Sequence, residues 1–174
     1  MSWENAHRRN PDETLAAFDT KGRKVIELGG KGARVNVPRS EMQRIDATMK
    51  DKILTHNHPR ALGQQGYYSI GNSFSVQDLA TAVRTNAKEI RAVTPRYTFS
   101  FRRTGKSWKI NASEVANVYR DVERSVKLGP KGLDSYVYIL GTDTAAGRAD
   151  ATLFHRIARE FAKRIGARYT KKKG

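Results

Sequence analysis

A short apolar segment that ends in two histidines, followed downstream by a helix start, constrains this chain more than any other feature. His56 and His58 follow the apolar pair at 53–54, and residues 75–78 (Ser-Val-Gln-Asp) open a helical pattern. Side chains two residues apart on a strand lie on the same side, so both imidazoles can reach one ion while Asn57 faces away. A carboxylate at the next helix start can complete a three-ligand zinc site with a fourth position open to water. The sequence therefore predicts a strand and a helix that together carry a metal centre.

Strand and helix patterns occur along the whole chain. Apolar runs and alternation predict strands at 15–18, 24–28, 33–37, the segment before the histidines, and 97–101. Helical spacing predicts helices capped at Ser40 (with Gln43) and at Ser75, the latter reaching Ile90, and further helices over 115–126 and 153–165. Residues 136–140 fit either a strand or a buried connector. We expect an α/β (α+β) fold with a mixed, largely antiparallel sheet flanked by helices and a helical C-terminal part.

Length and composition favour one domain over residues 1–174. The 174 residues and 38% hydrophobic content suffice for a single core. No apolar run approaches the roughly 20 residues that span a bilayer, and Met1 to Glu4 lack a signal-peptide core. We expect a cytoplasmic product without membrane contact, a phage particle or export without a signal peptide being the other locations. The chain has no cysteine, so histidines and carboxylates must hold any metal.

The charge is strongly basic. The chain has 33 Lys and Arg against 17 Asp and Glu, for a net charge of +16. Such an excess attracts polyanions and predicts nucleic acid or an acidic protein surface as a partner, the alternative being a solubilising surface. From residue 151 onward there are eight basic residues and one acidic residue, and the chain finishes with Lys171 to Lys173. We expect residues 169–174 to form a solvated, disordered basic tail.

The order of these residues resembles the JAMM (JAB/MPN+) metalloprotease family, in the variety found in phage head morphogenesis proteins and bacterial toxin-like proteins. The matching features are a glutamate-bearing strand at 11–19, His-Asn-His-Pro at 56–59 and Ser-x-x-Asp at 75–78. The resemblance covers residues 11–103. It implies a JAMM-like, cytidine-deaminase-like core there, followed by a helical extension at 112–168.

The resemblance also implies roles for individual residues. Zinc (Zn2+) would be held by His56, His58 and Asp78. Glu13 would act as general base and pass the proton to the leaving amine, and Ser75 would donate a hydrogen bond to the oxyanion. The implied activity is hydrolysis of an amide or isopeptide bond in a protein or peptide substrate.

Each of these residues also has a simpler interpretation. Ser75 and Asp78 match a helix capping box, which is compatible with a ligand role for the carboxylate. The two histidines fit a solvated pair at a strand end. Glu27, on the second expected strand, competes with Glu13 for the role of base. His155 is expected at an exposed or core-edge position in the last helix.

Two further functions remain open at this point. A nuclease or toxin-like enzyme could use His56 or His58 as general base on a phosphodiester, with the basic surface holding nucleic acid. A non-enzymatic module could use the same charge to bind nucleic acid or to assemble a phage particle. Compared with the family pattern, the loop between the histidines and Asp78 is lengthened by residues 60–72, which read as a mobile loop over the site.

Overall fold

Six strands form one mixed sheet at the centre of the protein. A computed structural model describes residues 2–32, 35, 37–58, 74–95, 97–128 and 146–174, with the side chains of 146–154 left aside. The strands are β1 (Thr14–Phe18), β2 (Lys24–Gly29), β3 (Ile53–Asn57), β4 (Glu89–Val93), β5 (Tyr97–Arg103) and β6 (Ala167–Lys173). Their order is β2-β1-β3-β4-β5-β6. Only the β3–β4 pair is parallel, and the other neighbours are antiparallel.

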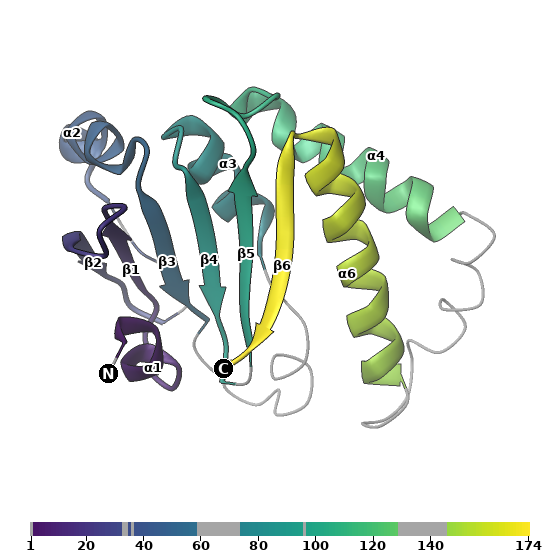
Figure 1. Cartoon of the computed structure of the whole chain (residues 1–174), viewed down its shortest axis with the longest axis horizontal. Coiled ribbons are helices and arrows are strands. Elements are labelled where there is room, and N and C mark those ends of the chain that lie inside the picture. The colour runs from purple at the N-terminus through teal and green to yellow at the C-terminus, as the bar shows by residue number, and fades with distance from the viewer. Residues whose placement is uncertain (1, 33–34, 36, 59–73, 96, 129–145) are drawn as a thin grey trace.

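Helices pack on the sheet, which confirms the expected α+β class. They are α1 (Trp3–His7), α2 (Arg39–Met49), α3 (Val76–Arg84), the short 3-10 helix η1 (Ala112–Glu114), α4 (Val115–Leu128) and α6 (Ala146–Arg164). Figure 1 shows α3 behind β4 and β5, with α6 beside β6. None of the helices in the described ranges is long and apolar enough to cross a membrane.

One cluster of buried side chains joins one face of the sheet to helices α2, α3, α4 and α6. Alternate strand residues point to this face, which we call the helix-covered face. Its largest fully buried members include Phe101 from β5, Leu54 from β3, Phe161 from α6 and Met49 from α2. The cluster runs from Ala17 to Ile165, so the C-terminal elements share a core with the first strands.

The helix that begins after Ser75 is shorter than its apolar spacing predicts. It ends at Arg84, and Asn86 then adopts a positive φ of 48°. A residue in this left-handed conformation ends a helix and turns the chain. Ile90 consequently lies in β4, beside Leu54 of β3, rather than on the helix. The prediction of a helix to Ile90 is wrong, and the turn brings β4 alongside β3.

The basic C-terminus is a strand rather than a disordered tail. Residues 167–173 form β6, which pairs with β5 along its whole length. The ring of Tyr169 lies 5.0 Å from that of Phe101 on the helix-covered face. This packing fixes the strand while most of its charged side chains remain exposed. The expectation of a disordered tail at 169–174 is wrong, and the last two residues of the region expected to be helical, 167–168, belong to β6.

Two smaller expectations also change. The second helix begins at Arg39 after Pro38 and has no side-chain cap, so Ser40 does not cap it. Of the strand expected at 33–37, the structure describes only positions 35 and 37, and neither is in a strand. The segment at 136–140 lies outside the described residues.

Candidate metal centre

The end of β3 positions two imidazoles on the helix-covered face. His56 lies opposite Leu15 of β1 and Ala92 of β4, and only 2% of it is exposed. One residue past the strand, the His58 N–H donates to the carbonyl of Val93 at 2.9 Å. This bond keeps the backbone extended, so the two histidine side chains project to the same side.

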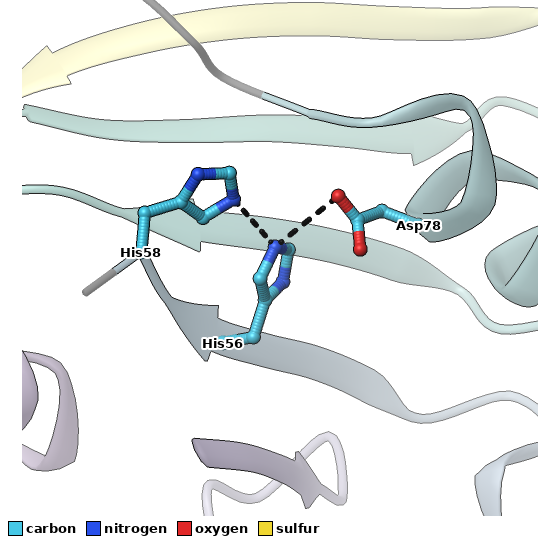
Figure 2. Close-up of side chains that lie close together, drawn as sticks. All are labelled: His56, His58 and Asp78. Atoms are coloured by element: carbon cyan, nitrogen blue, oxygen red, sulfur yellow. Dashed lines mark hydrogen bonds and ion pairs between the residues drawn. The ribbon is translucent and has the colours of Figure 1, made fainter. Parts of the chain in front are cut away.

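Three potential ligand atoms converge at this point. The Nε2 atoms of His56 and His58 are 2.9 Å apart, and Asp78 Oδ2 is 3.5 Å from His56 Nε2. Figure 2 shows the three side chains directed toward one another, the histidines from β3 and the aspartate from α3. All three atoms lie within 4.8 Å of one another. Across the described ranges this is the single cluster of three His, Cys, Asp or Glu side chains with metal-ligand spacing.

The first turn of α3 holds Asp78 in place. The Ser75 hydroxyl accepts from the Asp78 N–H at 3.1 Å, and Asp78 Oδ2 accepts from the Ser75 N–H at 2.7 Å, which is a complete capping box. The same hydroxyl lies 2.8 Å from Asp78 Oδ2 and donates to it. The capping interpretation is therefore confirmed. In this arrangement the Ser75 hydroxyl orients the carboxylate, and donation to an oxyanion requires it to turn.

The electrostatics of the cluster favour a cation. Burial lowers the pKa of His56, but the negative charges of Asp78 and Glu13 outweigh it and leave the pKa above 6.5. Burial would raise the pKa of Asp78, yet the two imidazoles hold it well below its usual range. For His58, burial and then the charge of His56 lower the pKa to about 4. Near neutral pH, Asp78 is charged and His58 is neutral and able to ligate.

The residues present fit zinc. Two imidazoles and a carboxylate are a usual ligand set for a catalytic zinc, and bonds of about 2.0–2.1 Å to a tetrahedral ion separate ligand atoms by about 3.3–3.4 Å. Two of the three separations, 2.9 and 3.5 Å, bracket that value, and the third, between His58 and Asp78, is within 4.8 Å. Nδ1 of His56 is buried and has no hydrogen-bond partner among the described residues. In ligating histidines this nitrogen usually donates to a carboxylate, a backbone carbonyl or water.

The two candidate bases lie on different sides of the sheet. Glu13 immediately precedes β1, and its pKa is raised by burial and by Asp78, against the opposing effect of His56. The carboxyl of Glu13 therefore interacts electrostatically with His56 and Asp78. Glu27 of β2 pairs with Ala16 of β1, and Ala16 pairs with Thr55 of β3. Thr55 precedes His56 and points to the other face of the sheet, so Glu27 also points away from the cluster. There it accepts a hydrogen bond from the indole of Trp3 at 3.1 Å.

Asn57 has a role that sequence reasoning missed. Its side chain is fully buried and points away from His56, as expected between two residues on one face. The amide oxygen accepts from the Thr14 N–H at 2.8 Å, and the amide nitrogen donates to the Asp12 carbonyl at 3.0 Å. These bonds hold the backbone on both sides of Glu13. The sequence feature that could have indicated this role is the position of Asn57 between two candidate ligands, because an asparagine side chain carries both a hydrogen-bond donor and an acceptor.

The remaining histidine interpretation agrees with a structural role. His155 is 8% exposed, and its Nε2 accepts from the Lys171 ammonium at 3.0 Å. Lysine can only donate, so Nδ1 carries the proton and donates to the Tyr169 hydroxyl at 2.7 Å. His155 is therefore at the edge of the core and apart from the metal cluster. The loop at 60–72 lies outside the described residues.

No protein-family model, curated protein or solved structure matches this chain. Any assignment of function therefore depends on its residues and their geometry.

Proposed function

We propose that this protein is a zinc-dependent hydrolase of the JAMM type that cleaves an amide or isopeptide bond. The observation that carries the proposal is the convergence of His56, His58 and Asp78 beside a carboxyl, Glu13, that is electrically coupled to them. Three protein ligands leave a coordination position for water, as catalytic zinc sites require. The mixed sheet with α2, α3, α4 and α6 on one face is compatible with this proposal.

In this mechanism His56, His58 and Asp78 would hold the ion, which would supply Lewis acidity and lower the pKa of a water to about 7. Glu13 would accept a proton from the attacking water and deliver it to the leaving amine. Its raised pKa suits a group that both takes and returns a proton. Ser75 keeps Asp78 oriented, and its hydroxyl is the proposed donor to the oxyanion.

The basic charge supports a second candidate of a different class. A nuclease would use one of the histidines as general base while cations hold the phosphodiester. His58, with a pKa of about 4, is a weak base near neutral pH. The convergence of three potential ligand atoms favours the hydrolase, in which His58 serves as a neutral ligand.

The test compares Glu13→Gln with its matched control Glu27→Gln. Each change removes one carboxylate from the hairpin formed by β1 and β2, but only Glu13 is on the side of the metal-ligand cluster. We expect Glu13→Gln to keep fold and zinc while lowering hydrolysis by about 10²-fold or more, and Glu27→Gln to change it little. The assay is zinc-dependent cleavage of internally quenched peptides and of isopeptide-linked peptides.

The contrary outcomes are distinct. Full activity in Glu13→Gln with loss in Glu27→Gln would show that the base is misassigned. Full wild-type activity in both variants would contradict the peptidase mechanism. Cleavage of nucleic acid that a chelator abolishes, without peptide cleavage, would favour the nuclease.

A further inference from the structure

The sheet face opposite the metal cluster is polar and basic over β5 and β6. Directly paired residues on neighbouring strands point to the same face, and successive residues alternate. Pairs Thr98–Lys172, Ser100–Thr170 and Arg102–Arg168 lie on this opposite face, which we call the outer face. None of these six side chains is apolar.

Described elements cover the outer face only in part. Helix α1 lies over β1 and β3, where Trp3 packs on Phe18 with ring centroids 6.1 Å apart. Figure 1 shows α1 at the lower ends of these strands, away from most of β5 and β6. The side chain of Arg102 is 53% exposed, and Arg168 and Lys172 are exposed. Arg8 reaches one end of the row, where its guanidinium donates to the Thr98 hydroxyl at 2.9 Å, and Ser100 in the middle is 7% exposed.

The charges on this region are poorly compensated. Arg102 and Arg168 are directly opposite each other, and like charges in such a pair destabilise a sheet. The nearby carboxylate, Glu89, lies 3.8 Å from Arg102 but is held more closely by Arg91, at 2.7 Å. Within the described part of the chain neither Arg168 nor Lys172 is in an ion pair. A bound anion would relieve this repulsion.

The donors are evenly spaced along the strand. Arg168, Thr170 and Lys172 are two residues apart on one face, which separates successive side chains by about 6.6 Å. Thr170 and Ser100 form a hydroxyl pair at 3.1 Å between the two cations. A row that alternates cation, hydroxyl and cation offers charged and neutral donors to a polymer with regularly spaced anions.

We propose that the outer face of β5 and β6 binds the phosphate backbone of nucleic acid. An acidic protein is a poorer fit, because protein interfaces have an apolar centre, whereas interfaces with nucleic acid are polar and positively charged. No aromatic side chain lies on these two strands' outer face, so contact is with phosphates rather than stacked bases. The surface is separate from the metal cluster, and binding is independent of zinc.

The test is a double variant, Arg168→Gln with Lys172→Gln, compared with Lys21→Gln with Lys106→Gln. Lys21 and Lys106 are exposed in turns outside the row, so both double variants lower the net charge equally. Binding of a fluorescent 20-nucleotide DNA, single-stranded and duplex, is measured by anisotropy at several salt concentrations with and without a chelator. Thermal melting checks that both proteins are folded.

We expect the outer-face variant to bind at least about fivefold more weakly than the wild type. The slope of log affinity against log salt should fall by about 1.4 for single strands and 1.8 for duplex, as expected for two lost phosphate contacts. The turn variant should stay within about twofold of the wild type, and the chelator should have no effect. Equal weakening in both variants would overturn the proposal. A competition experiment gives the second contrary outcome. If poly-glutamate displaces the labelled DNA as well as unlabelled DNA does at equal charge concentration, the partner is an acidic protein and the proposal is overturned.

Discussion

Zinc should raise the thermal stability of this protein, because the ligand cluster exists only in the folded chain. A ligand that binds only the folded state stabilises it by about 2.7 kcal/mol at a free concentration of 100 times its Kd. For a chain of 150–250 residues each 1 kcal/mol raises Tm by about 2–4 °C. The expected rise is therefore about 5–11 °C. Differential scanning fluorimetry with a zinc buffer and with a chelator measures it.

The matched variants are His56→Ala with His58→Ala, and His7→Gln as the control. The double change removes two ligand atoms, so zinc should no longer raise Tm, and zinc content after dialysis should fall from about one per chain to none. His56 is buried, and its loss lowers Tm without metal as well. Each variant is therefore compared with its own zinc-free form. His7→Gln should keep the full rise.

The pH dependence of zinc binding gives a second measurement on the same site. The raised pKa of His56 means that zinc displaces a proton from it when the pH is below that pKa. His58 is already neutral above its pKa of about 4 and releases none near neutrality. The affinity for zinc should fall as the pH is lowered, and calorimetry in two buffers should show the release of up to one proton per zinc.

A full zinc-induced rise in the Tm of the double histidine variant would refute the assignment of the metal site.

Two other predictions concern the elements around the site. Asn57→Ala removes the hydrogen bonds to the Thr14 N–H and the Asp12 carbonyl, so urea unfolding should show a loss of about 0.5–1.5 kcal/mol for each lost bond. Unchanged stability would mean that these bonds do not hold the segment. Burial, then Lys171 and Arg159, lowers the pKa of His155 to about 4, so its contribution to stability is complete above pH 6.5 and is lost as the pH falls toward 4. Urea midpoints from pH 7 to 4.5 should fall more for the wild type than for His155→Gln, and equal slopes would contradict this role.

Local signals around the site are strong, which is why sequence reasoning located its elements. A serine followed three residues later by aspartate predicts a helix start, and the structure has a capping box at Ser75. Alternation within 97–101 predicts a strand with a buried face, and Phe99 and Phe101 are almost fully buried in β5. These patterns depend on neighbours close in sequence.

Contacts between distant segments decide the features that were missed. Ile90 continues the helical spacing of α3, but the backbone of Asn86 ends the helix and pairing with β3 takes Ile90 into a strand. The charge at 167–173 favours a tail, whereas pairing with β5 and the packing of Tyr169 produce β6. Pairing partners cannot be read from local pattern, and tertiary contacts override local propensity.

The choice between Glu13 and Glu27 shows how strongly strand register controls a site. Moving one residue along a strand reverses the face to which a side chain points. Glu27 pairs with Ala16, which is opposite Thr55, so it points to the outer face. The sequence offers two glutamates on neighbouring segments, and only the register separates them.

The metal cluster and the start of α3 are coupled through one carboxylate. Asp78 faces both imidazoles, and the same Oδ2 atom accepts from the backbone and hydroxyl of Ser75. Burial lowers the pKa of His56, and the carboxylates of Asp78 and Glu13 raise it by more, so the cluster favours positive charge at this imidazole. The capping box directs the carboxylate toward this point. The folding of β3 and α3 therefore brings the three candidate ligands together, and a zinc ion would bind to side chains that already converge.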